Sequence, residues 1–308
     1  DFISSRYGKS TSLGALVSAV LIFGIIPYIS LQLKAIAFCL DLLIDRPGLH
    51  YGAQAELPFF QDAALYIAIA LAFFTILFGV RKLDPNERHE GLVAAIAFES
   101  VIKLLAFLSV GLFVTFYLFD GFADLFRQAA ARPELQRLLT LQGQDMDSWT
   151  WLWLVLISMF AILLLPRQFH MAVVENTDIR FTRKASWLFP LYLLLINIFV
   201  LPIALGGKLL FPESAGVEAD TFVISIPLLM DNLPLAIFAG LGGLSAATSM
   251  VIVSVITLSI MISNHLVLPS LLRSPVIRET RYHDVFQRLR GIRRVSVVMV
   301  LLRSYGFY

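Results

Sequence analysis

Charged residues and cysteine are both scarce in this sequence. Asp, Glu, Lys and Arg make up 15% of the 308 residues, whereas about 25% is usual in soluble proteins. The formal net charge is only +2, so no concentrated basic face is available to bind nucleic acid, and we predict no nucleic-acid partner. Cys39 is the single cysteine, which excludes an intrachain disulfide framework.

The sequence also lacks the motifs of common active sites. It contains no Cys/His metal spacing, nucleophile elbow, phosphate-binding glycine loop or kinase signature. Its five histidines lie in predicted loops or at the ends of predicted spans, which does not favour haem ligation inside a helix bundle. We therefore predict no catalytic residue, no metal site and no organic cofactor within these residues.

Apolar residues, by contrast, are in excess. They make up 58% of the chain, against about 45–50% in ordinary soluble proteins. A soluble domain of this size could not bury that excess, so lipid must serve as part of its solvent. The composition predicts an integral membrane protein.

Seven apolar stretches are candidates for membrane-spanning helices, because a bilayer core of roughly 30 Å needs about 20 helical residues. The predicted spans are 12–43, 60–80, 91–118, 149–165, 187–205, 233–267 and 292–308. Pro27 lies near the middle of the first span and predicts a kink there. The predicted fold class is an all-α transmembrane bundle with one domain over residues 1–308. The chain begins at Asp1 without Met and stops at Tyr308 inside an apolar run, so we expect this domain to be truncated at both ends.

Lys and Arg gather in alternate loops of this arrangement. The richer set of loops includes Arg81 and Lys82, Arg183 and Lys184, and the stretch 273–294. The positive-inside rule places this set in the cytoplasm. We therefore predict a multi-pass protein of the bacterial inner membrane, with the Asp1 end cytoplasmic and the Tyr308 end external. The stretch 273–294 is itself partly amphipathic, so it is either an interfacial helix on anionic lipid or, as the charge bias favours, an ordinary cytoplasmic loop.

Two predicted external connections, 120–148 and 206–232, are long. The second contains an apolar piece, Thr221–Met230, that is too short to span a bilayer. We expect this piece to form a hairpin over the external mouth of the bundle.

The sixth predicted span is rich in small and hydroxyl residues. Its small residues would let neighbouring helices approach closely, and they are Gly240, Gly242, Gly243, Ala246 and Ala247. Ser245 and Ser249 stand one turn apart on one face, with Thr248 beside them. Their oxygens could bind a hard cation such as Na⁺, although packing of helices is the more usual reason for such residues.

Two ionisable residues lie inside the third predicted span. Glu99 and Lys103 are spaced i and i+4, so they can pair along one helix face. Intramembrane ionisable residues mark functional sites by default. The alternatives are a proton or cation relay and a structural ion pair near the inner interface.

Four motifs give the sequence a family resemblance. They are the opening DFISSRYG at 1–8, GLVAAIAFE ending at Glu99, Gln168-Phe-His170, and SAATSM at 245–250. In this order they resemble segments of the sodium:solute symporter family, and together they cover nearly the whole chain. That resemblance implies a leucine-transporter-type fold of inverted five-helix repeats with discontinuous helices.

Within the family, the sequence is most similar to the transporter-like N-terminal domains of hybrid sensor histidine kinases of the CbrA type. The strings that carry this likeness are PYISLQLKAI, FESVIKLLAFLSVGLF, RQFHMAVVENTD and WLFPLYLLLINIFVLPIALGG. The likeness implies a C-terminal kinase module with a response regulator as partner, so the full-length protein would be an enzyme although this part has no catalytic site.

Two positions depart from the family pattern. Ala246 stands where the resemblance implies a second sodium-binding hydroxyl, and a methyl group cannot coordinate Na⁺. The segment 162–165 is solidly apolar where symporters often have unwound, glycine-rich backbone. Both departures suit a solute sensor, or a carrier coupled to protons.

We therefore predict a domain that binds, and transports or reports, a small organic nutrient such as an amino acid. Its partners would be membrane lipid and that solute, and Na⁺ or H⁺ would be the coupling ion. The predicted site residues are Ser245, Ser249 and Thr248 for the ion, Glu99 and Lys103 for a proton or cation relay, and Tyr28 and Gln32 for the solute. The alternatives are a free-standing Na⁺- or H⁺-coupled symporter and a membrane scaffold subunit without a solute.

Overall fold

The computed structural model describes residues 2–44, 63–79, 90–138, 147–176, 178–212, 216–273 and 282–307, and every regular element in these ranges is helical. The α-helices are α1 (Phe2–Arg6), α2 (Thr11–Ile44), α3 (Ala63–Gly79), α4 (Glu90–Leu112), α5 (Phe122–Ala130), α6 (Pro133–Leu138), α7 (Ser148–Leu164), α8 (Pro166–Phe169), α9 (Ile179–Leu210), α10 (Phe222–Leu229), α11 (Leu233–Met261), α12 (Leu268–Arg273) and α13 (Tyr282–Tyr305). Wider π-helical turns, η2 (Phe113–Leu118), η4 (His170–Val174) and η7 (Ile262–Val267), follow α4, α8 and α11, and a 3₁₀ turn, η6 (Ala219–Thr221), precedes α10. The predicted all-α membrane fold is confirmed.

Four helical stretches in the described residues are long and apolar enough to cross a membrane: Thr11–Ile44, Val93–Leu118, Ile179–Leu210 and Leu233–Leu271. There is a fifth if Ser148–Ile162 and Pro166–Val174, which meet at a bend of 41°, form one broken span. The protein is therefore multi-pass, but the predicted number of seven spans is not confirmed. Helix α3 has only 17 residues, roughly 25 Å of helix, and α13 begins with a polar, basic half.

The helix that contains the fifth predicted span, 187–205, is longer than that span. Helix α9 begins eight residues earlier, where the carboxylate of Asp178 accepts a hydrogen bond from the Arg180 amide at 2.8 Å. This N-cap satisfies a backbone donor of the first turn, so the helix continues through residues that the apolar pattern excluded. The predicted boundaries at 60–62 and 80, and the chain ends Asp1 and Tyr308, lie outside the described residues.

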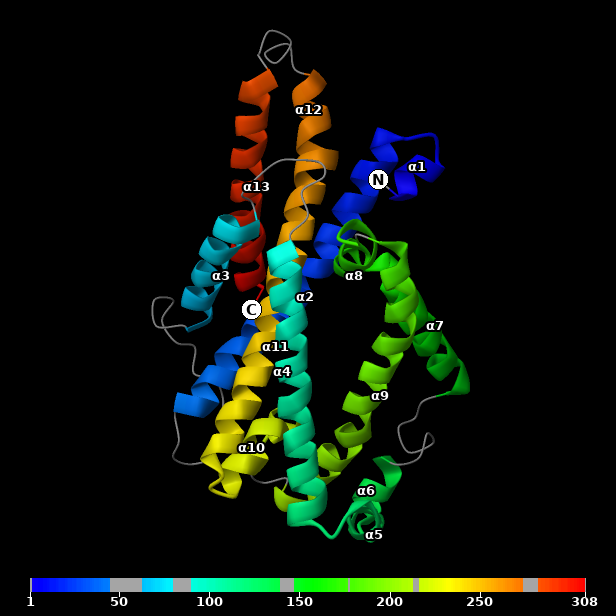
Figure 1. Cartoon of the computed structure of the whole chain (residues 1–308), viewed down its shortest axis with the longest axis vertical. Helices are drawn as coiled ribbons and strands as arrows, with labels where there is room; N and C mark the ends of the chain where they lie inside the picture. The colour runs from blue at the N-terminus through cyan, green and yellow to red at the C-terminus, as the bar shows by residue number, and fades with distance from the viewer. Residues whose placement is uncertain are drawn as a thin grey trace.

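Helix α11 runs through the middle of the bundle and packs against α2, α3, α4, α10 and α13. Figure 1 shows α5, α6 and α10 at one end of the molecule, α1 and α12 toward the other, and α8 near the middle. The short helices α5, α6 and α10, which belong to the two long connections predicted to be external, therefore lie at the same end. Which end faces the cytoplasm stays a prediction, as does the inverted repeat.

Glycines of α11 bring two neighbouring helices into close contact. A Cβ added at Gly240 would lie 2.6 Å from Leu43 Cδ1 of α2, and one at Gly242 would lie 2.7 Å from Ala106 Cβ of α4. Real Cβ atoms essentially never come this close. A larger residue at Gly242 would force α4 and α11 apart, and one at Gly240 would require the Leu43 side chain to move. The expectation that small residues of this segment allow close approach is confirmed.

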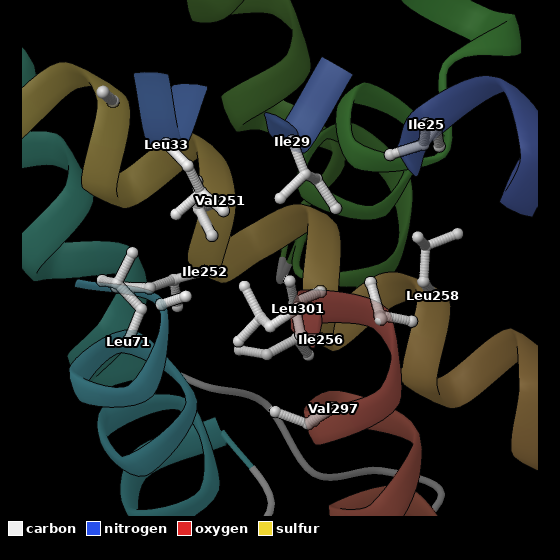
Figure 2. Packing of buried hydrophobic residues seen from close by; sticks show 14 of the residues in the cluster. Ile25, Ile29, Leu33, Leu71, Val251, Ile252, Ile256, Leu258, Val297 and Leu301 are labelled. Atoms are coloured by element: carbon white, nitrogen blue, oxygen red, sulfur yellow. The ribbon is translucent and has the colours of Figure 1, made fainter. Parts of the chain in front are cut away.

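Two apolar clusters flank α11. In the first, shown in Figure 2, Ile29 and Leu33 of α2 lie over Val251 and Ile256 of α11. Leu301 of α13 lies beside Ile256, and Val297 of the same helix lies below them. The second cluster joins the end of α4 with α5, α9 and α10. Both clusters exclude lipid from the contacts that fix α2 and α4 on α11.

The apolar piece Thr221–Met230 belongs to the second cluster. It forms the short helix α10, in which Phe222 and Ile226 are fully buried. Gly207 of α9 leaves the space that the Phe222 ring fills, because a Cβ there would overlap the ring. The piece is a single short helix rather than a hairpin, and its apolar side chains are buried at one end of the bundle. Its position over the external mouth stays a prediction.

The contact between α4 and α11 predicts the effect of filling one glycine. Gly242→Ala should lower the free energy of unfolding by about 1–3 kcal/mol, the usual cost of overpacking, because Ala106 has no flexible side chain that could move aside. Gly24→Ala is the matched control, since Gly24 is an exposed helical glycine of α2 with open space around its Cβ position. It should be neutral or stabilising by up to about 1 kcal/mol. Denaturant titration of the purified protein in detergent measures both, and equal effects would contradict the close approach.

Candidate functional site

The helix that precedes the site is broken by a proline. Leu165 has an extended backbone (φ −75°, ψ 121°), α7 ends just before it, and Pro166 is the first residue of α8. A residue before proline is disfavoured in the α region, because the proline ring clashes with its backbone and Cβ. The stretch 162–165 departs in composition from the glycine-rich segment of symporters, yet the helix is interrupted at Leu165. Apolar composition does not prevent a break where proline follows.

Arg167 lies directly after this break and reaches α2. Its Nη1 donates a hydrogen bond to the Tyr28 hydroxyl at 2.5 Å, and its Cζ lies 5.2 Å from the centroid of the Tyr28 ring. The Tyr28 hydroxyl in turn lies 2.9 Å from Met250 Sδ of α11, to which it donates. These contacts connect α8, α2 and α11 at one point. Tyr28 was predicted as a site residue, and Pro27 before it lies within the continuous helix α2.

Arg167 was not among the predicted site residues. Only its position directly after Pro166, between two apolar stretches, could have indicated a buried role. The tertiary contact with Tyr28 has a sequence separation of 139 residues, and no local pattern reports such a pairing.

Glu99 of α4 meets Thr248 of α11 beside this contact. The Thr248 hydroxyl lies 3.3 Å from Glu99 Oε1 and 2.9 Å from the backbone oxygen of Ser245. A threonine hydroxyl carries one hydrogen, so the two acceptors share it or compete for it. All three residues are half-buried. The structure thus joins Glu99 to the hydroxyl segment of α11.

Lys103 belongs to the same group of charges. The charges that act on its ammonium group come from Glu99 and from Arg167. No salt bridge within 4.0 Å joins Glu99 and Lys103 in the part of the chain that the structure describes, and the Glu99 carboxylate accepts its hydrogen bond from Thr248 instead. We define the polar cluster as Tyr28, Glu99, Lys103, Arg167 and Thr248. It holds two cations and one carboxylate.

Two predicted site residues are not connected to the polar cluster by a polar contact among the described residues. The Ser249 hydroxyl donates to the Ala246 oxygen of its own helix at 3.1 Å, which is the behaviour of a packing residue. Gln32 is half-buried one turn beyond Tyr28. Ser245 contributes its backbone oxygen to Thr248.

Neighbouring contacts hold the cluster in position. The Tyr192 hydroxyl of α9 donates to the backbone oxygen of Ser100 at 3.2 Å, directly after Glu99. Beyond α8, His170 Nε2 lies 3.2 Å from Glu175 Oε1, and both side chains are largely buried. This pair closes the π-helical turn that follows Arg167. The cluster is therefore supported from α9 and from the segment after the break.

The chain is similar to one curated protein. It is 29% identical over 268 residues to the uncharacterized symporter YhjB of Bacillus subtilis (strain 168). The alignment covers 84% of this chain and 48% of that protein, so the chain spans about half the length of this relative. No protein-family model and no solved structure matches the chain. The likeness supports a symporter-like membrane transporter.

The contact between Arg167 and Tyr28 predicts a measurable contribution to stability. Tyr28→Phe keeps the ring but removes the hydroxyl that accepts from Arg167, so it should lower the free energy of unfolding by about 1–3 kcal/mol, as for other hydrogen bonds to charged groups. Tyr117→Phe is the control, because Tyr117 is 77% exposed and stacks on Phe113 through its ring. Denaturant titration should show that Tyr28→Phe hardly changes the free energy of unfolding when Arg167→Gln is already present, because the two residues act as a pair. Additive effects of the two substitutions would contradict the contact.

Proposed function

We propose that this domain binds a small organic nutrient carrying a carboxylate, such as an amino acid, and carries it across the membrane together with a coupling ion. The observation that supports this most directly is the position of Arg167. It follows a helix break, and its guanidinium group meets Tyr28 beside Glu99 and Thr248. Broken helices and ionisable side chains inside a bundle are typical of transporter binding sites. The likeness to a symporter favours transport over a scaffold role.

The charges of the polar cluster favour an anionic group on the solute. Two cations, Arg167 and Lys103, act beside one carboxylate, Glu99. A guanidinium group can bind a carboxylate through two parallel hydrogen bonds. Arg167 has one nitrogen on the Tyr28 hydroxyl, and its remaining donors can turn to a solute. We assign the solute carboxylate to Arg167 and Lys103, with Tyr28 holding the guanidinium group in place.

Glu99 is the best candidate for the coupling site. An ionised carboxylate only accepts hydrogen bonds, whereas a protonated one also donates. Protonation of Glu99 would therefore change its contact with Thr248 and free the threonine hydroxyl for the Ser245 oxygen. This exchange links proton binding on α4 to α11. A Na⁺ site built from Ser245, Thr248 and Ser249 is the alternative, and it has Ala246 where a further hydroxyl would be needed.

Movement of solute requires two states of the protein with different access to the cluster. Solute or proton binding shifts the balance of these states only through a difference in affinity between them. The same difference would drive a sensory output if a kinase module follows. That role, like membership of the sodium:solute symporter family, remains a prediction from resemblance.

The proposed coupling predicts how two substitutions affect transport. In proteoliposomes supplied with radiolabelled amino acids, uptake driven by an imposed proton gradient should fall at least about tenfold in Glu99→Gln, because the amide cannot carry the proton. Exchange of internal for external solute should persist, since it needs no net proton movement. Thr248→Val should also reduce driven uptake. Its control is Thr257→Val on the same helix, whose hydroxyl donates to its own helix at Val253.

Uptake that follows a Na⁺ gradient and survives Glu99→Gln would contradict the assignment of Glu99. Absence of any exchange in the wild-type protein would contradict transport as such. The two outcomes are distinguishable because exchange does not depend on the coupling ion.

The assignment of the solute carboxylate has a separate test. The amino acid that binds best should stabilise the protein against heat, because a ligand stabilises the state that it binds. Its carboxamide, which lacks the negative charge, should bind at least about tenfold more weakly. In Arg167→Gln the acid and the amide should bind alike. A preference for the acid that persists in this variant would place the carboxylate elsewhere.

A further inference from the structure

An apolar groove runs between the end of the α11–α12 stretch and α13. Its volume is about 590 Å³, within the range of small-molecule sites. Ile262, Val267 and Leu271 form one wall, and α13 supplies the other through Gly291, Ile292, Val295 and Met299, together with Ser296 and Arg288. We call this feature the α12–α13 groove.

The groove has a charged end and an apolar end. Figure 1 shows α12 and α13 running in opposite directions, so Leu271 lies toward the Arg288 end and Ile262 toward the Met299 end. Arg288 and Met299 are eleven residues apart on α13, roughly 16 Å along the helix. The candidate membrane span Leu233–Leu271 ends at Leu271. The charged end therefore lies beside the end of this apolar stretch, where basic side chains could meet lipid headgroups.

The charge at this end is strongly positive. Arg288, Arg290, Arg293 and Arg294 lie within two turns of α13, and the acidic residue of this helix is Asp284, one turn before Arg288, so the basic residues outnumber it. Arg288 lines the groove and is exposed. The Nε atom of Arg290 is buried without a hydrogen-bond partner among the described residues. An anionic group at this end would meet complementary charge.

We propose that the α12–α13 groove binds one anionic phospholipid, with an acyl chain along its apolar walls and the headgroup phosphate on Arg288. Val295 and Met299 are 62% and 58% exposed, so the groove is open at the surface of the protein. The length of the groove suits an acyl chain, and the arginines suit a phosphate, whose oxygens match the guanidinium donors. The inference does not depend on the transported solute. The sequence left two alternatives for the basic stretch 273–294, an interfacial helix on anionic lipid and an ordinary cytoplasmic loop. A bound phospholipid favours the first of them.

The test compares two lipids with the same acyl chains. The purified, delipidated full chain is titrated with phosphatidylglycerol or with phosphatidylcholine, and bound lipid is counted by native mass spectrometry. The wild-type protein should bind phosphatidylglycerol about fivefold more tightly, the gain typical of one arginine at an anionic headgroup. Arg288→Gln should abolish the preference. Arg294→Gln should retain it, because Arg294 is exposed on the same helix but does not line the groove.

A second pair of variants tests the apolar walls. A Cβ at Gly291 would meet nothing within 4 Å, so Gly291→Leu places its side chain in the groove without a backbone clash and favours the helix. It should weaken binding of both lipids at least about tenfold, because the side chain occupies the space of the acyl chain. Gly24→Leu adds the same side chain at an open position of α2 and should leave binding unchanged.

Several results would overturn the proposal. Equal affinity for the two lipids would remove headgroup recognition, and equal losses in Arg288→Gln and Arg294→Gln would indicate diffuse surface charge. A dimer of the wild-type protein that Gly291→Leu dissociates would make a second copy of the chain the occupant. If Gly291→Leu does not fold, the two arginine variants still decide the question.

Discussion

The close approach of α11 to α2 and α4 holds the bundle together. Gly240 and Gly242 remove the side chains that would keep these helices apart, and apolar clusters on both sides keep the contact closed. In a bilayer, packing of this kind replaces the hydrophobic effect as the force between helices. The contact also decides the chemistry, because it brings Thr248 of α11 within hydrogen-bond distance of Glu99 on α4.

The break at Pro166 supplies the remaining part of the site. A helix through Leu165 would bond its backbone internally and carry Arg167 along the axis of α7. The break bends the chain by 41° and directs Arg167 to Tyr28 instead. A guanidinium group in an apolar bundle is costly without partners, and the tyrosine ring and hydroxyl provide them.

Arg167 and Arg288 both lie next to apolar side chains, but their positions in the bundle differ. In the polar cluster, Arg167 is half-buried and faces residues of other helices. In the α12–α13 groove, Arg288 lies at an exposed end where the span stops. The first arrangement suits a solute that enters the bundle. The second suits a lipid that remains at its surface, since its headgroup stays in the interfacial layer.

The all-α membrane fold, the long helices and the close packing of α11 could all be predicted from the amino-acid sequence, because hydropathy and residue size are local properties to which the bilayer responds directly. The sequence also indicated Tyr28, Glu99, Lys103 and Thr248 as site candidates, since polar residues in apolar helices stand out. Which of them meet became visible only when the helices were packed together. Arg167 joins Tyr28 across 139 residues, whereas Ser249 bonds to its own helix. The helix packing that sets these partners depends on many distant contacts at once, which no single stretch of sequence contains.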